Sequence, residues 1–590
     1  MNIKSLLITL GLAVPSIASA YDYSNYSPAF SANDYREALN MGLKFFGGQR
    51  CGNTHNWMLH DNKSVSDNYC HIKDGKGKVN GGANGDYDLT GGWHDCGDHI
   101  KVGTTMGYAA VSLLVAYDIW PEAFQDNYDG EYGGKNGIAD VLDEVKIATD
   151  YFMKCFPDAN SFVYYVGFEG DHNMWVTSST QSKQTVENGG DPRPVWITSE
   201  NGGPQAANYA TALALMAMHY PDAEYREQCA KYAKIAYAYA EAHKFKHASI
   251  PIFYSNPNEE WTDELSLASI MMYNLTGDES YKKNAVLFLQ NKWESNSPLA
   301  WDTMADFAYY YIIKANPNAG NGQGGYFKDF LMKNAFSLHI STAEKDSNGF
   351  PYYQSKWGTN KLACGGAAAA SLYKKLVDDG VITTTENVIK IENFDNRIID
   401  YVLGKNEFNH TFLHGFKDDM TFRIHHRNAM GRNDNPVQNV KNTCDFMFAS
   451  GGLIGGPSGT GQFSNIIEGG ASYTETEGGC DYNAPFVLAI APLVAKMDPV
   501  DITETPLVEK TSFHVYPSET DDYIVVEPLV VNYQGKAVAN VVSANGSVVL
   551  SAQIDDANPL VMNVSGLSRG VYVLNVDFNG GSKSYKFIKK

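Results

Sequence analysis

The sequence predicts an all-α toroid of two concentric rings of six helices, followed by a small β-sandwich. Two observations predict it. Helical periodicity recurs between residues 33 and 500, interrupted by long Gly-rich and aromatic loops, and apolar residues alternate with period two after residue 512. The length of 590 residues suits one large domain plus an appendage. Long loops in a compact domain usually serve function, so we expect the functional residues there.

The helices are predicted from apolar residues that recur every three or four positions. The segment 206–219 is apolar almost all round, which indicates a buried helix, and 224–243 follows with Tyr and Ala at helical spacing. The other predicted helices cover residues 104–118, 138–156, 263–275, 280–291, 303–314, 327–336, 363–376, 393–403 and 484–496.

The C-terminal part has a different pattern. Pro499, Pro506 and a run of Asp, Thr and Glu indicate a linker over 499–511. Residues 512–590 are predicted to form the β-sandwich, because short alternating segments are separated by Gly-containing turns. The predicted strands cover 513–516, 523–527, 537–542, 547–550 and 571–576, with turns at 534–535, 545–546 and 579–581.

Charge and the N-terminus restrict the class of function. A formal net charge of −21 argues against nucleic acid as a partner, because affinity for phosphates comes from Lys and Arg. A neutral polysaccharide is compatible with this charge. Residues 1–20 read as a secretory signal peptide, with Lys4, an apolar run over 5–14 and an Ala-Ser-Ala end at 18–20. No run reaches transmembrane length, so we expect a secreted protein.

The densest chemical segment is the turn Asp88–Lys101. Asp95 and Asp98 are three residues apart across Gly97, and paired carboxylates on a tight turn can position and deprotonate a water. The alternative is a calcium-binding or purely structural turn, since Asp and Gly favour both. A second acidic, Gly-rich segment, Glu475–Ala484, lies almost 400 residues away, so only the fold can bring the two together.

The cysteines are too few for a disulfide scaffold in a chain of this size. Cys444 and Cys480 flank one loop-rich region and could pair. The others with a clear context, Cys155, Cys229 and Cys364, lie in apolar helical patterns and are predicted to be buried thiols.

A possible metal site involves Cys51, Cys70, His71 and His94. Two thiols and two imidazoles match the ligand count of a closed structural zinc site. A Cys51–Cys70 disulfide is the alternative, because an exported protein can form one.

Together the motifs resemble glycoside hydrolase family 9, the cellulase family with an (α/α)6 barrel. The resemblance covers residues 33–495, within a predicted catalytic domain of 21–498, and its motifs are specific in combination. They are Phe45–Gly52, Gly91–Asp98, Asp171–His172 with Trp175, Trp261–Leu265, Asp400–Gly404, Ile424–Arg427, Leu453–Pro457 and Asp481–Ala484.

The resemblance implies an inverting endo-β-1,4-glucanase acting on cellulose or related β-glucans. Asp98 matches the general base, Asp95 the carboxylate that helps hold the attacking water, and Glu477 the general acid. Inversion needs roughly 6.5–9.5 Å between the two carboxyl groups, and the acid needs a raised pKa. The residues that match sugar contacts are His172, Trp175, Trp301, His425, Arg427 and Tyr482.

The resemblance also implies metals but no organic cofactor. The Cys-His pair at 70–71 and His94 match a zinc site found in one branch of the family. Asp263, Glu264 and Asp302 resemble the family's calcium site, with helix capping as the alternative for the two acids that begin a helix.

The sequence departs from the family pattern in the active-site loops. Cys96 replaces Ala in the catalytic turn. Glu468 stands where the family has Asp, nine residues before Glu477, and Ile466 stands where it has an aromatic residue.

Residues 512–590 resemble the C-terminal sorting domain of type IX secretion, which implies that this machinery is a partner and that the protein is secreted, with possible attachment to the cell surface. A carbohydrate-binding sandwich is the alternative, although Trp is absent after residue 357. Alternatives for the whole chain are an exo-acting enzyme, a xyloglucan- or mixed-linkage-preferring glucanase, and a non-catalytic glycan-binding surface protein.

Overall fold

The structure is a computed structural model, and no helix in its described part is long and apolar enough to cross a membrane. The predicted signal peptide, the predicted linker, Trp175, Cys444, Ile466 and Glu468 lie outside the described residues. The described residues are 23–52, 70–127, 135–174, 176–248, 261–290, 298–320, 322, 325–335, 344–345, 349–353, 357–383, 393–418, 424–430, 450–459, 461–463, 473–497, 513–517, 519–528, 537–554, 560–578 and 581–590.

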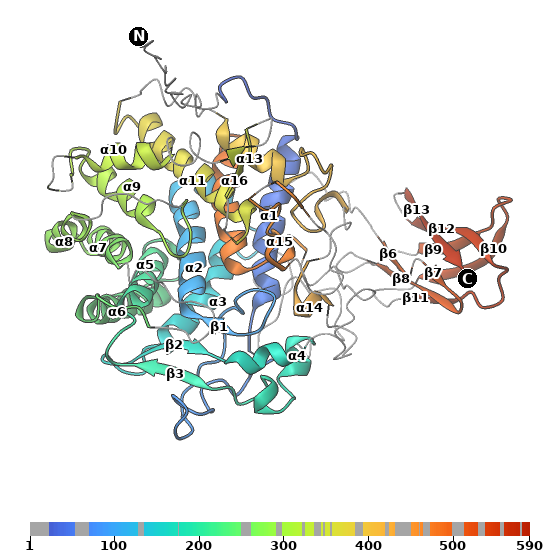
Figure 1. The fold of residues 1–590 in the computed structure, drawn as a ribbon, viewed down its shortest axis with the longest axis horizontal. Helices are drawn as coiled ribbons and strands as arrows, with labels where there is room; N and C mark the ends of the chain where they lie inside the picture. Colours follow the sequence, from blue (N-terminus) through green and yellow to red (C-terminus); the bar gives the residue numbers. More distant parts are fainter. Residues whose placement is uncertain are drawn as a thin grey trace, which may run out of the picture.

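In the part of the chain that the structure describes, six inner helices form a closed ring in which each helix packs against the next (Figure 1). Nearly every residue of α2 and α16 is buried, which explains why these segments are apolar all round. In ring order the helices are α2 (Gly103–Ile119), α5 (Gly203–His219), α7 (Thr262–Thr276), α9 (Ala305–Ala315), α11 (Thr359–Asp378) and α16 (Cys480–Ala495).

In the described residues, six outer helices pack on the outside of this ring, each against one or two inner helices, so the predicted double ring is confirmed. They are α1 (Ala32–Gln49), α3 (Asp140–Lys154), α6 (Ala223–Ala242), α8 (Glu279–Leu289), α10 (Phe327–Met332) and α13 (Phe394–Val402).

Helix α1 was not among the predicted helices. Its last turn contains Gly47 and Gly48, which weaken a helical pattern, although a capping box between Ser31 and Asp34 marks its start.

Inner helices begin at the same end of the barrel. At the start of α16, the ring of Tyr482 lies against Gly358, which directly precedes α11. At the start of α7, Asp263 accepts a hydrogen bond from the backbone N–H of Met304, which directly precedes α9. The loops ahead of the inner helices therefore meet at one end, and these loops carry the predicted functional residues.

A three-stranded antiparallel sheet at this end was not predicted, because its strands are short. It consists of β1 (Lys101–Val102), β2 (Phe162–Val166) and β3 (Val195–Thr198), in the order β1-β2-β3. The strand register pairs Lys101 with Val166, so the turn Asp88–Lys101 is joined directly to the loop that follows β2. The remaining short elements are η2 (Pro121–Ala123), η3 (Glu169–Asn173), α4 (Ser178–Gln181), η4 (Val186–Asn188), β4 (Glu344–Lys345), β5 (Pro351–Tyr352), η6 (Phe416–Asp418), α14 (Arg427–Met430) and α15 (Tyr473–Thr476).

The C-terminal strands form two sheets around a core of their own, which confirms the predicted β-sandwich (Figure 1, red). The sheets have the orders β10-β9-β12-β13-β7 and β11-β8-β6. Strands β7, β11 and β13 were not predicted, because they are short or rich in Lys and Ser. The strands are β6 (Phe513–Tyr516), β7 (Glu519–Thr520), β8 (Tyr523–Pro528), β9 (Ala537–Val542), β10 (Val548–Ile554), β11 (Leu560–Asn563), β12 (Gly570–Phe578) and β13 (Gly581–Lys589).

Candidate active site

Backbone hydrogen bonds tie three distant segments into one site. The N–H of Cys480, at the start of α16, donates to the carbonyl of Asp95 at 2.9 Å. The N–H of Arg427 donates to the carbonyl of Gly97 at 2.8 Å. A Cβ at Gly97 would lie 2.4 Å from the carbonyl oxygen of His425, so only glycine lets these two segments approach this closely. The fold therefore joins segments that are almost 400 residues apart.

Asp98 is buried in the turn and paired with His172. The Nε2 atom of His172 lies 3.0 Å from Oδ2 of Asp98, and the backbone N–H of Ile100 donates to Oδ1 at 3.3 Å. Burial alone would raise the pKa of Asp98, but the hydrogen bond from His172 and the charge of Arg427 hold it below its ordinary value. Asp98 is therefore ionised near neutral pH, as a general base must be.

Glu477 has the opposite protonation behaviour. Burial, followed by the negative charge of Asp98, raises its pKa from an ordinary 4.5 to about 7. The backbones of Glu477 and His425 pair in an isolated parallel β-bridge. The backbone N–H of His425 donates to the carbonyl of Thr476 at 2.9 Å. One site thus contains an ionised carboxylate and a carboxylic acid that stays protonated close to neutral pH.

The second carboxylate of the turn, Asp95, accepts a hydrogen bond from the hydroxyl of Thr105 at the start of α2. Oxygen atoms of Asp95 and Asp98 and the sulfur of Cys96 lie within 4.8 Å of one another. A calcium ion prefers oxygen ligands, and a thiol is a poor one. This composition therefore favours a water-positioning pair over the calcium alternative.

His425 and Arg427 lie beside this pair. Burial, then the charge of Arg427, lowers the pKa of His425 to about 3, so the imidazole is neutral. The guanidinium of Arg427 donates to the carbonyl of Gly97 at 3.2 Å and to the carbonyl of Met174 at 3.1 Å. Arg427 thereby joins the turn that carries Asp95 and Asp98 to the end of η3, the short helix that contains His172.

Two of the predicted aromatic residues are described. Tyr482 lies in the first turn of α16 and is buried, and Trp301 is partly buried in the loop before α9. Sequence reasoning missed Trp357 and Lys361. Trp357 is 47% exposed just ahead of α11, and Lys361 lies over the Tyr482 ring at 4.3 Å. The sequence signal that could have indicated Trp357 is a Trp-Gly pair directly before an apolar helix.

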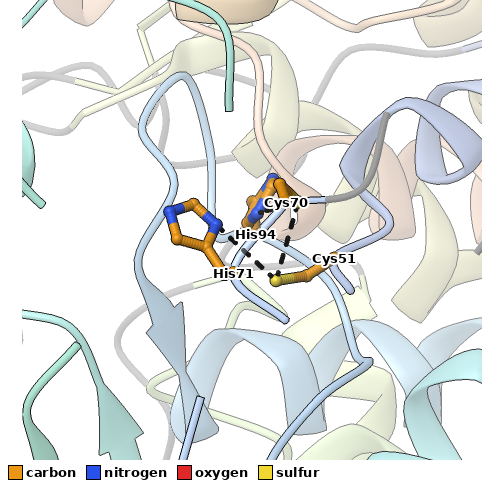
Figure 2. A group of neighbouring side chains, drawn as sticks. All are labelled: Cys51, Cys70, His71 and His94. Atoms are coloured by element: carbon orange, nitrogen blue, oxygen red, sulfur yellow. Dashed lines mark hydrogen bonds between the residues drawn. The ribbon is translucent and has the colours of Figure 1, made fainter. Parts of the chain in front are cut away.

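The predicted zinc ligands converge in the structure. In Figure 2 the side chains of Cys51, Cys70, His71 and His94 point toward a common centre, and their candidate ligand atoms all lie within 4.8 Å of one another. The distances are 3.9 Å between the two sulfurs, 3.9 Å from Cys51 Sγ to His71 Nδ1, and 3.7 Å from Cys70 Sγ to His94 Nε2. In a tetrahedral zinc site, neighbouring ligand atoms lie roughly 3.4–3.8 Å apart. The donor set therefore fits zinc.

The disulfide alternatives do not match the structure. The two sulfurs of Cys51 and Cys70 are far beyond bonding distance, and both residues are free thiols. Cys480 is also a free, buried thiol, which donates to the carbonyl of His94 at 3.2 Å. The other three cysteines with a clear context are buried and free as predicted: Cys155, Cys229 and Cys364.

The predicted calcium residues lie at the starts of two inner helices. Asp263 and Glu264 are fully buried in the first turn of α7, and Asp302 lies in the loop before α9. Both acids lie in the first turn, as the helix-capping alternative expects, although Trp261 is the N-cap and no side chain makes a capping hydrogen bond. Asp263 instead accepts from Met304, which brings the two loops together.

Residues 35–490 match the model of glycosyl hydrolase family 9. The chain belongs to this family. Residues 514–590 match the secretion system C-terminal sorting domain, so the predicted sorting domain and the secreted location are also confirmed.

The family 9 chain is 27% identical to endoglucanase A of Bacillus pumilus over 483 residues, which are 78% of this chain and 66% of that protein. It is 33% identical to endoglucanase A of Fibrobacter succinogenes over 301 residues, or 48% and 63% of the two chains. The matched part is therefore slightly under two thirds of each relative's length. Among solved structures, the cellulase Cel9M of C. cellulolyticum in complex with cellobiose has 25% identity and a TM-score of 0.63, covering 78% of this chain and 98% of that one.

Proposed function

We propose that this secreted family 9 member is an inverting endo-β-1,4-glucanase that hydrolyses cellulose or related β-glucans. The observation that carries the proposal is the divergent protonation of two neighbouring carboxyl groups. Asp98 has a lowered pKa, whereas the pKa of Glu477 is raised to about 7. Such a pair separates the roles of base and acid within one site.

In the proposed reaction, Asp98 takes a proton from a water held with the help of Asp95, and the water oxygen attacks the anomeric carbon. Glu477 simultaneously gives its proton to the glycosidic oxygen, and the bond between that oxygen and the anomeric carbon breaks. The attack comes from the face opposite the leaving group, so the configuration inverts. The base ends protonated and the acid ionised, and exchange with solvent resets both.

The residues around the pair suit the binding of a neutral sugar chain. His425 is neutral and Arg427 is a fixed cation, so both can donate to sugar hydroxyls. His172 is 29% exposed, so it is accessible while it holds Asp98. Trp357 and Trp301, in the loops ahead of α11 and α9, offer flat apolar faces, which suit the C–H faces of sugars, and Trp175 stays a predicted sugar contact outside the described residues.

We also propose that Cys51, Cys70, His71 and His94 hold a structural zinc ion. Burial holds the pKa of both imidazoles well below the ordinary value, so each is neutral and available as a ligand. A bound ion would fasten the end of α1 to the catalytic turn, since Cys51 follows α1 and His94 immediately precedes Asp95. Calcium at Asp263, Glu264 and Asp302 remains a proposal that rests on the burial of the first two carboxylates.

The type IX secretion machinery is the proposed partner of residues 514–590. The support is the match to a sorting domain, together with a β-sandwich that has its own core. Deletion of this domain should leave the enzyme inside the cells of a secreting host while its specific activity is unchanged.

The proposed activity is tested with the mature chain on carboxymethylcellulose. An endo-acting enzyme lowers the viscosity well before reducing ends accumulate, whereas an exo-acting enzyme does the reverse. Asp98→Asn and Glu477→Gln should each lose most of kcat, by at least roughly 100-fold.

A matched control is Asp118→Asn. It removes the charge of a carboxylate that accepts hydrogen bonds from His219 and Tyr311, near the C-terminal ends of α2 and α5. This control should keep full activity. An inactive wild type, or catalytic variants as active as the control, would refute the proposed function.

A further inference from the structure

Arg193 is a fully buried arginine in the loop before β3, and each of its five N–H groups has an acceptor. Its Nε and Nη2 atoms donate to the two carboxylate oxygens of Asp74 at 3.0 and 2.7 Å. Nη2 also lies 3.7 Å from the sulfur of Cys51. Nη1 donates to the carbonyl of His99 and to Oδ1 of Asp171, the latter at 3.3 Å.

Two of these contacts involve residues next to the proposed base, Asp98, and next to its hydrogen-bond partner, His172. His99 directly follows Asp98, so the hydrogen bond to the His99 carbonyl fixes the backbone of the catalytic turn. Asp171 directly precedes His172, whose Nε2 atom lies 3.0 Å from the Asp98 carboxylate. One guanidinium therefore holds both the turn that carries Asp98 and the segment that supplies its hydrogen-bond partner.

The simplest alternative is that Arg193 only neutralises the buried carboxylate of Asp74. Asp74 has a second cation for that purpose, because Nζ of Lys101 lies 2.7 Å from the same Oδ2 atom. Neutralisation of Asp74 also does not require the bonds to His99 and Asp171. A planar fork that reaches four partners at fixed angles is suited to positioning, and a lysine cannot reproduce it.

We propose that Arg193 is a positioning residue, which sets the geometry of Asp98 and His172 relative to the Cys/His cluster. The inference rests on the proposed role of Asp98 as the base. It assigns to Arg193 an effect mainly on the chemical step, because none of its five donors bonds directly to a predicted sugar-binding residue and only His172 is reached, through Asp171.

The test compares Arg193→Lys with Arg397→Lys in the full chain. Arg397 is an equally buried arginine in the outer helix α13, where it stacks on the Tyr401 ring. Arg193→Lys should lower kcat roughly 10- to 100-fold, the usual consequence of a small misplacement, while KM stays within about twofold. The acidic limb of its pH profile should move to higher pH, because the hydrogen bond from His172 lowers the pKa of Asp98.

Arg397→Lys should change neither kcat nor the acidic limb. Burial raises the pKa of Asp171 to about 6, so it carries little charge at the acidic limb, and kcat is the readout for its variant. Asp171→Ala removes the oxygen that accepts from Nη1 of Arg193 beside His172, so it should lower kcat as Arg193→Lys does. If Arg193→Lys does not fold, the kcat of Asp171→Ala decides the question. An unchanged kcat and acidic limb in the folded variants would overturn the inference while wild-type activity stands. An inactive wild type would overturn the proposed function instead.

Discussion

The raised pKa of Glu477 sets the alkaline limit of the enzyme. At pH 7, a glutamic acid with a pKa of about 7 is protonated in half of the molecules. With the ordinary value of 4.5, only about one molecule in 300 would carry the proton at that pH. Since Glu477 must donate a proton, kcat should stay near its maximum up to about pH 6 and then fall about tenfold per pH unit above 7.

The assay is kcat from initial rates on carboxymethylcellulose between pH 4 and 9, at constant ionic strength and saturating substrate. Recovery of activity after return to pH 6 separates titration from unfolding. On the acidic side, the lowered pKa of Asp98 keeps the base ionised, so the rate should hold down to about pH 4. An alkaline midpoint near pH 5, or a rate independent of pH above 7, would refute the reasoning about Glu477.

Three further predictions concern neighbouring residues. Cys96→Ala should move the alkaline limb to higher pH, because a hydrogen bond from Cys96 lowers the pKa of Glu477; an unmoved limb contradicts this contact. The purified protein should contain about one zinc per chain by mass spectrometry. Cys51→Ser should lose the metal and lower the melting temperature by several degrees. A metal-free wild type that is no more stable than Cys51→Ser argues against the site. Gly97→Ala should lower kcat at least roughly tenfold, since its Cβ would meet the His425 carbonyl at 2.4 Å, and a fully active variant would show that the turn can relax.

The sequence predicted the double ring because buried helices carry a strong local signal. Helices α2, α5 and α16 are apolar all round, and each predicted segment overlaps an observed helix. Helix α16 begins four residues earlier than predicted, at Cys480, because its polar first turn resembles a loop. That turn faces the active site, so its polar residues serve the site and hide the helical pattern of apolar residues.

Only part of the candidate site could be predicted from the sequence. Asp95 and Asp98 are close in the chain, so their spacing alone suggested chemistry. Glu477 required the fold, and it was found through the resemblance to family 9. Arg193 was missed because its partners His99 and Cys51 are 94 and 142 residues away, and no local pattern marks a buried arginine.

The most direct test of the proposed mechanism is the anomeric configuration of the first product. Proton NMR during hydrolysis of a soluble β-1,4-glucan oligosaccharide distinguishes the two anomers before they equilibrate. If Asp98 activates water while Glu477 protonates the leaving oxygen, the new reducing end appears first as the α-anomer. Initial appearance of the β-anomer would mean a retaining reaction through a covalent intermediate and would contradict the roles proposed for both carboxyl groups.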